Sequence, residues 1–394
     1  MFRHLFKLIW NKKKQNFLLL TEMLASFLVI FAVFSLMAYY YLNYRKPMGF
    51  EYENVWVINY NNALQTNNAD SLSRFYEGVR QMLRSMPPVR EVSYTSQNVP
   101  FSNTTNGGGY SYNRVKYDRV NMFTVEDSYK NVLNLQLLEG RWFEKMDIAS
   151  RDRPVVINGS FKEKLFGKGK AVGKLLHDYQ GKNPSRIIGV VQDVKMKGDY
   201  SDIGYATFVR ADTGSFHWLG QILVKVSPDA DAAFESRLYK AMAGAMRNSN
   251  VEIVHLTDLR RARNQTYIIP LIVILIVSGF LIVNVALGLF GVLWYNINKR
   301  KAEIGLRRAV GATGGSVSGQ LVAEAMILAT LSLLIGTFFA IQFPLLNVGD
   351  LPSAVYLIAL VLSILFIYLL VLICSLYPGR QAAAIYPAVA LHEE

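Results

Sequence analysis

The sequence has almost no cysteine and few histidines. Cys374 is the one cysteine among 394 residues, and five histidines are scattered along the chain. A single cysteine excludes an internal disulfide, and the histidines show none of the close spacings that bind zinc. The chain is therefore neither a disulfide-stabilised domain nor a zinc module.

The sequence also lacks the motifs that bind nucleotides or carry out covalent catalysis. The stretch GKGKAVGKL fails the spacing of a phosphate-binding loop, and Lys174 is followed by Leu175 where serine or threonine is needed. No serine or cysteine stands in a recognisable nucleophile setting. We therefore predict that the chain is not an enzyme and binds no cofactor of its own.

Long apolar runs dominate the sequence instead. Hydrophobic residues make up 52% of the chain, and its mean hydropathy is positive, as is typical of membrane proteins. Four runs are each long enough to cross about 30 Å of hydrocarbon. They predict transmembrane helices at 17–41, 267–295, 317–343 and 354–377. The predicted fold class is an α-helical membrane protein with four transmembrane helices and a large α+β extracytoplasmic domain inserted between helices 1 and 2.

Positive charge is concentrated beside the apolar runs. The formal net charge is +13, which on a surface patch would indicate a nucleic-acid partner. Here the basic residues flank predicted spans, so the positive-inside rule explains them more simply and we predict no nucleic acid partner. The short connection at 344–353 carries no lysine or arginine. We expect both termini and residues 296–316 in the cytoplasm, with residues 45–263 outside.

Both ends of the chain are predicted to lie on the cytoplasmic membrane surface. Residues 1–16 place apolar side chains at helical spacing among arginine and lysine, which indicates an amphipathic helix. The apolar run that follows is too long for a signal peptide. Residues 378–394 are expected to form a tail on the same surface. Glu22, near the basic end of the first span, is expected to snorkel or to pair with a lysine.

The region 45–263 has the pattern of a water-soluble domain whose two ends mirror each other. Residues 50–98 and 217–258 each read as strand, helix, strand, and the apolar stripes of both helices are expected to be core. Two such halves can pair into one sheet covered by two helices. Between them lies an inserted subdomain at 99–216, in which NTTNGGGYSYN (103–113) is expected to be a turn-rich loop.

A basic stretch separates the second and third spans. KRKAEIGLRRAVGA at 299–312 predicts a helix from residue 299 to 310, because only Gly305 weakens it, by roughly 1 kcal/mol relative to alanine. Glu303 is four residues from both Lys299 and Arg307, so it is expected to pair with either along one helix face.

Two interpretations of this stretch remain open. Ile297, Ile304 and Val310 are expected to supply a narrow apolar stripe. A positively charged loop at this place sets membrane orientation and needs no further role. A short cytoplasmic helix lying on the membrane surface would instead offer itself to a partner. The first interpretation describes how the stretch is placed, and the second describes its function.

The same stretch resembles a family signature. EIGLRRAVGA, followed after a short gap by QLVAEA at 320–325, resembles the FtsX-like permease domains of MacB-type bacterial ABC transporter permeases. In the large domain, LEGRWF at 138–143, RPVVINGSFKEKLFG and SRIIGVVQDV resemble, in that order, the MacB-like periplasmic core domain. The ending of the chain resembles the Pro-Ala-x-x-Ala-Leu ending of the family.

The resemblance implies a permease subunit in the bacterial inner membrane. It implies a second permease chain, in a homo- or heterodimer, and a cytoplasmic ABC ATPase, expected from another chain, that binds the ATP. In that family, closure of the ATPases moves the periplasmic domain, an action called mechanotransmission. Export of a drug, a peptide or a lipoprotein is the expected outcome, with a periplasmic adaptor or outer-membrane channel as a further partner. The alternative is an FtsX-like signalling subunit that regulates a cell-envelope hydrolase or a sensor kinase.

We also predict two groups of functional residues. Gly288, Gly291 and Glu324 are expected to pack the membrane helices, since small residues let helices approach closely in lipid. The residues expected to couple to the ATPase are Lys299, Arg300, Glu303, Ile304, Gly305, Arg307, Arg308 and Gly311.

Overall fold

The chain folds into two compact units. A computed structural model describes residues 13–384 except 62–63, 65, 67, 179, 181–183 and 347. Residues up to 42 and from 268 onwards form one unit, which we call the membrane unit, and residues 43–267 form the other, which we call the extramembrane unit. The extramembrane unit is inserted in the chain between the first and second long apolar helices, as the sequence predicts.

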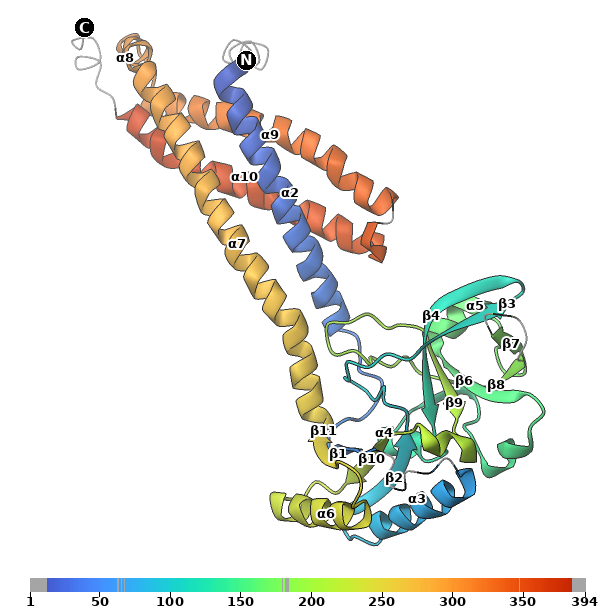
Figure 1. The fold of residues 1–394 in the computed structure, drawn as a ribbon. Helices are drawn as coiled ribbons and strands as arrows, with labels where there is room; N and C mark the ends of the chain where they lie inside the picture. The colour runs from blue at the N-terminus through green and yellow to red at the C-terminus, as the bar shows by residue number, and fades with distance from the viewer. Residues whose placement is uncertain are drawn as a thin grey trace. The chain divides into compact units, whose positions relative to one another are not determined.

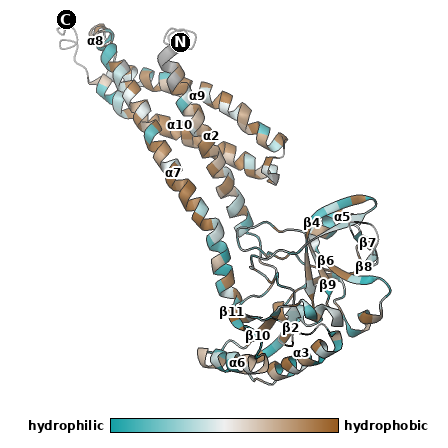
Figure 2. Ribbon diagram, viewed as in Figure 1, coloured by the Kyte–Doolittle hydropathy of each residue, from teal (hydrophilic) through white to brown (hydrophobic). Residues whose placement is uncertain are grey.

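Four described helices are long and apolar enough to cross a membrane. They are α2 (Lys13–Tyr44), α7 (Leu256–Lys299), α9 (Gly314–Leu345) and α10 (Ser353–Ala383). Figure 2 shows hydrophobic residues along all four, whereas the start of α7 is hydrophilic. Each helix is longer than the predicted span, because the backbone hydrogen bonds continue into the polar flanks, where each added residue gains one bond.

Pro344 and the chain ends show where the predicted boundaries differ. Pro344 begins the connection predicted at 344–353, but it lies inside α9. The connection predicted at 344–353 accordingly contains the end of α9, followed by the short helix η3 (Val348–Asp350). The amphipathic helix predicted for residues 1–16 falls largely outside the described residues, as does the tail beyond residue 384.

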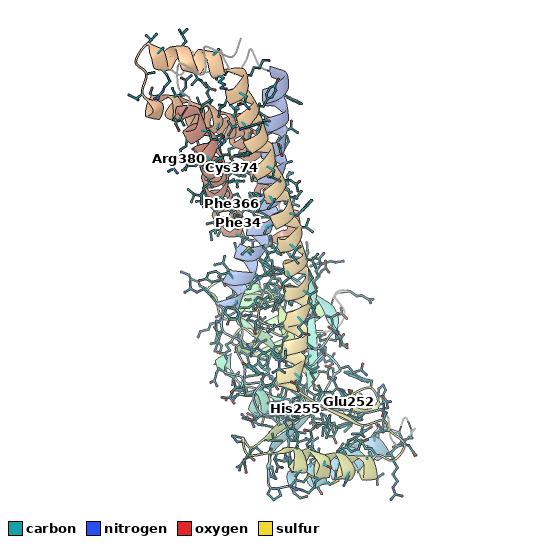
Figure 3. The ribbon with its side chains drawn as sticks, turned by 90° about the vertical axis from the view of Figure 1, so that its left-hand side faces the viewer. Phe34, Glu252, His255, Phe366, Cys374 and Arg380 are labelled. Atoms are coloured by element: carbon teal, nitrogen blue, oxygen red, sulfur yellow. The ribbon has the colours of Figure 1, made fainter. Side chains whose placement is uncertain are left out.

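The first span packs against each of the other three. Phe27 of α2 is fully buried and lies against Gly336 of α9, where any side chain at residue 336 would collide with its ring. Phe34 of α2 meets Phe366 of α10 edge to face, with ring centroids 6.0 Å apart (Figure 3). One apolar cluster joins residues of α2, α7, α9 and α10. The sequence did not single out Gly336, because its importance depends on what faces it.

The two glycines of α7 that were predicted to pack the spans differ in their surroundings. A Cβ at Gly288 would collide with the carboxylate of Glu22, so α2 and α7 approach closely there. Glu22, which is expected from the sequence to snorkel or to pair with a lysine, therefore lies against α7. A Cβ at Gly291 would meet no described atom within 4 Å, so Gly291 contacts no other helix of this chain there, and its role in helix packing stays a prediction.

The two ends of the extramembrane unit share one sheet. Strand β1 pairs antiparallel with β10 on one side and β11 on the other, and β10 also pairs with β2. These strands are β1 (Val55–Asn59), β2 (Val89–Thr95), β10 (Gln221–Val226) and β11 (Glu252–His255). The helices α3 (Ala69–Arg84) and α6 (Ala232–Ala245) both pack against this sheet and share one core with it (Figure 1). The mirrored pattern in the sequence predicted this pairing.

Alternate side chains of β1 enter two different cores. Trp56 and Ile58 are buried with the apolar stripes of α3 and α6. Val55 and Val57 point to the opposite face and are buried with the short helix α4 (Tyr129–Leu133). Successive residues of a strand face opposite sides of the sheet. Because residues 55–58 are all apolar, β1 is covered on both faces.

The inserted subdomain closes into a ring of six described strands. They pair in the order β4, β3, β7, β8, β6 and β9, and β9 pairs back with β4. Their bounds are β3 (Gly107–Tyr112), β4 (Val115–Val125), β6 (Arg153–Asn158), β7 (Leu175–Asp178), β8 (Pro184–Val191) and β9 (Ala206–Arg210). The additional elements are β5 (Leu137–Gly140), which pairs with β8, helix α5 (Gly159–Phe166), and the short helices η1 (Lys145–Ala149) and η2 (Thr213–His217). Among the described residues, each of these six strands is therefore paired with a neighbour on both sides.

One prediction for this subdomain is wrong. The sequence GGGYSY, expected to be part of a loop, forms β3 between β4 and β7. Glycine does not favour strands, but strand preference depends strongly on context, and both neighbours supply hydrogen bonds. Tyr110 is buried in the core of the ring. Tertiary pairing therefore decides the structure of this stretch.

Candidate coupling site around helix α8

The basic stretch between the second and third spans forms a separate short helix, α8 (Lys301–Ala309). Arg300, with φ −106° and ψ 14°, separates α8 from α7, so the single helix predicted from residue 299 is interrupted there. After α8 the chain turns at Gly311, whose φ of +106° is readily adopted only by glycine. The hydroxyl of Thr313 then caps α9 by accepting a hydrogen bond from the amide of Ser316 (3.3 Å).

The inner face of α8 is apolar and is held by three spans. Ile304 is 6% exposed and Gly305 is also buried. Ile304 belongs to a small cluster formed with Ile297 of α7, Val317 and Leu321 of α9, and Ala382 of α10. Helix α8 is thus attached to the ends of α7, α9 and α10 by apolar contacts.

Val310 does not belong to this cluster. It was expected to continue the apolar stripe of Ile297 and Ile304, but its side chain is 82% exposed. Six residues turn a helix by about 600°, so residue 310 stands roughly 240° around the axis from residue 304. The predicted stripe is therefore correct for Ile297 and Ile304 and wrong for Val310.

Arg300 ties the start of α8 to α9. Its guanidinium lies 3.1 Å from Glu303 and 3.0 Å from Glu324 of α9, and its side chain is only 12% exposed. The partner predicted for Glu303 at this end was Lys299, and the structure places Arg300 there instead. Glu324, expected to serve helix packing, thus holds a cation at the end of the third span.

Arg307 and Gln320 complete a closed ring of polar side chains. Arg307 lies 2.6 Å from Glu303, as predicted for the i, i+4 pair, and donates to Gln320 at 2.8 Å. Gln320 in turn donates to Glu324 at 3.1 Å. We call the set Arg300, Glu303, Arg307, Gln320 and Glu324 the polar ring. Its two arginines and two glutamates balance in charge, and it joins α8 to α9 through side chains that the sequence alone would assign to a partner.

The outer face of α8 is apolar and exposed. Leu306 is 57% exposed and Val310 is 82% exposed, and Ala302 and Ala309 are exposed beside them. These four residues, which we call the outer face, follow the i, i+4, i+7, i+8 spacing of one helix side. Charge dominates the sequence of this stretch and hides the outer face, and only the burial of Ile304 shows which side of α8 stays exposed.

The remaining predicted residues lie at the margins. Lys299 is exposed at the end of α7. The guanidinium of Arg308 lies beside Gly314 at the start of α9, where an added Cβ would come within 3.0 Å of it. Within the described part of the chain, no group of three His, Cys, Asp or Glu side chains could hold a metal ion. The polar ring and the buried inner face thus hold α8 in place, and its outer face stays exposed.

Comparison with known proteins identifies the family. Residues 20–240 match the family described as MacB-like periplasmic core domain, and residues 275–387 match the FtsX-like permease C-terminal family. The chain belongs to the MacB/FtsX-type family of ABC transporter permeases. The second match includes α8, the polar ring and the outer face.

The curated relatives of this permease are longer proteins. The macrolide export ATP-binding/permease protein MacB of Neisseria meningitidis is 24% identical over 321 residues, which are 78% of this chain and 48% of that protein. MacB 1/2 of Paracoccus denitrificans is 26% identical over 56% of this chain and 34% of that protein. This chain therefore spans about half the length of these relatives or less, and what it matches is their permease part. Among solved structures, the periplasmic region of MacB from Actinobacillus actinomycetemcomitans is 19% identical with a TM-score of 0.39, covering 54% of this chain and 92% of that one.

Proposed function

We propose that this permease couples ATP hydrolysis by a cytoplasmic ABC ATPase to movement of the extramembrane unit. The observation that carries the proposal is the way in which α8 is attached to the membrane helices. Its inner face and the polar ring attach it to the ends of α7, α9 and α10, while the outer face is left exposed. A force applied to the outer face would therefore reach three spans at once.

The chain connectivity supports transmission to the other unit. Helices α2 and α7 both continue from the membrane unit into the extramembrane unit, without an intervening loop. A continuous helix transmits tilt and rotation along its length far better than a flexible linker. We propose a dimer of permease chains with the ATPase beneath it, exporting a substrate on the outer side. Two of its longer relatives are named for macrolide export, which supports export over the signalling alternative.

The test of this proposal is binding and stimulation of the ATPase. The purified chain alone is expected to hydrolyse no ATP, because hydrolysis needs a phosphate cradle with a lysine and a Mg²⁺-binding hydroxyl. With the ATPase it should copurify and show substrate-stimulated turnover in reconstituted membranes. Gly305→Pro, which costs a helix interior roughly 3 kcal/mol, should abolish both while the extramembrane unit stays resistant to protease. If Gly305→Pro binds and couples normally, residues 299–312 only set the membrane orientation. If the permease copurifies with a histidine kinase and not with an ATPase, the signalling alternative is favoured.

The proposed orientation predicts a labelling pattern. In a background without Cys374, a cysteine at Asn103 should react with an impermeant thiol reagent in intact spheroplasts, since residue 103 is exposed on the extramembrane unit. A cysteine at Thr313, between α8 and α9, should react only after the membrane is permeabilised, because the basic flanks hold that side in the cytoplasm. Labelling of residue 313 from outside would overturn the orientation.

A further inference from the structure

A buried lysine joins the end of α2 to a loop of the extramembrane unit. Lys195 lies in the loop 192–201 between β8 and β9 and is only 1% exposed. Its ammonium donates to the backbone carbonyls of Asn43 (2.7 Å), Asp199 (2.6 Å) and Lys46 (3.3 Å). Asn43 is in the last turn of α2, where carbonyls carry the negative end of the helix dipole and favour a cation. The ammonium therefore fixes the end of α2 to this loop.

The same loop is fixed to the start of α7 through Asp199. The carboxylate of Asp199 accepts from Arg260 Nε (3.0 Å) and Nη2 (2.8 Å), and from Asn264 Nδ2 (2.7 Å). The amide of Asp199 donates back to Asn264 Oδ1 (3.0 Å). Arg260 and Asn264 are four residues apart, so both lie on one side of α7. Asp199 thus binds Lys195 with its carbonyl and α7 with its side chain.

A line of tyrosines follows the same path. Tyr200 of the loop stacks on Tyr44, the last residue of α2, with ring centroids 5.8 Å apart. Its other neighbour is Tyr267 of α7, with centroids 6.4 Å apart. Two independent sets of contacts, one polar and one aromatic, therefore run from α2 through the loop 192–201 to α7, all within residues 43–267.

We propose that Lys195 and Asp199 are positioning residues for coupling: they lock the end of α2 to the start of α7, so that the two helices turn the extramembrane unit as one body. The contacts described above support the joint itself. Its importance for coupling rests on the proposed function. Without this joint, either helix could move at its entry to the unit and the motion would be lost there.

The chemistry of the joint favours this role over simple stability. Burial away from water lowers the pKa of the Lys195 ammonium, which shows that the site costs free energy for the charged form. Replacing buried charges by packed apolar groups is often neutral or stabilising for a fold. A buried ammonium has a different advantage, because it binds three carbonyls from separate segments in one fixed geometry, which no apolar side chain does.

A distance measurement tests the joint directly. Spin labels at Arg45 and Arg261, both exposed and placed on either side of the joint, are expected to give one narrow distance distribution in a cysteine-free background. Lys195→Met keeps the length of the side chain and removes its three hydrogen bonds, so the distribution should broaden. Lys225→Met is the matched control, because Lys225 pairs with Glu51 at 2.8 Å on the same unit, and it should leave the distribution narrow.

Failure to fold is separated from loss of the joint by a second variant. Asp199→Asn keeps the shape of the side chain and its backbone contacts but loses the charge that holds Arg260. It should broaden the same distribution, and protease resistance of the extramembrane unit should stay as in the wild type. A narrow distribution in both Lys195→Met and Asp199→Asn would overturn the proposed joint.

The effect of the joint on coupling is measured separately, and a cross-link is expected to restore it. In membranes reconstituted with the ATPase, Lys195→Met should keep ATPase binding and lose about tenfold in ATP-dependent substrate movement, since hydrogen bonds to a charged group are worth that much. Cysteines at Tyr44 and Tyr200, joined by a short bifunctional thiol reagent, should restore it, because they replace the lost tie by a covalent one.

The two proposals fail in different ways. If wild-type chains show no ATP-dependent movement, the proposed function is wrong, whereas the distance distributions still decide the joint. If the wild type is coupled and Lys195→Met is coupled equally well, the role of the joint in coupling is overturned while the proposed function stands.

Discussion

A chain with both Leu306→Asp and Val310→Asp is expected to lose ATPase binding while inserting and folding normally. These two side chains are the largest on the outer face of α8, with exposed fractions of 57% and 82%. If they fill a pocket on the ATPase, each aspartate removes a central apolar contact, and the loss of such a contact costs at least about 2 kcal/mol, or roughly thirtyfold in affinity. The inner face and the polar ring are untouched, so α8 itself should stay in place.

The measurement is the affinity of the purified ATPase for the permease in detergent or nanodiscs. Leu346→Asp is the matched control, because Leu346 is 69% exposed at the other end of α9 and receives the same change. The control should bind as the wild type does. Equal binding by the double variant would exclude the outer face as the docking surface and return attention to the basic residues Lys299 and Arg308, which the sequence alone favours.

Removal of Arg300 is expected to release α8 from the membrane unit. Arg300→Met removes the cation shared by Glu303 and Glu324. Glu303 keeps its pair with Arg307, whereas Glu324, which is only 19% exposed, is left with the amide of Gln320. Breaking a fully buried pair in this way costs about 3 to 5 kcal/mol, which is an upper bound for a pair that keeps some contact with water. ATP-coupled activity should fall by at least about tenfold, because each 1.4 kcal/mol is a factor of ten.

Trypsin cleavage at Arg307 and Arg308 reports the position of α8. In inside-out vesicles this cleavage should be slow in the wild type and fast in Arg300→Met. Lys299→Met removes one neighbouring positive charge that is exposed and serves as the control. The exchange Arg300→Glu with Glu324→Arg should recover part of the activity, since it restores the attraction. If Arg300→Met and Lys299→Met behave alike, the polar ring does not hold α8.

The sequence by itself determined the features that depend on local pattern. Four apolar runs of sufficient length require four membrane helices, because the backbone must satisfy its hydrogen bonds within each span. Helical and strand periodicity in residues 50–98 and 217–258 was enough to predict a shared sheet with two covering helices. The motif at 303–312, with QLVAEA after it, was enough to indicate the family. Even the pair of Glu303 with Arg307 follows from one turn of helix.

Tertiary structure alone decided which side chains meet across the chain. Arg300 finds Glu324 at a separation of 24 residues, and Lys195 finds the carbonyl of Asn43 at a separation of 152. No sequence periodicity predicts such pairings. Residues 107–112 likewise become strand β3 because β4 pairs along them and β7 pairs with Tyr110 and Ser111. The same holds for Val310, whose exposure follows from the burial of Ile304 on the other side of α8. Local sequence sets which element forms, and long-range packing then sets which face of it remains free to act.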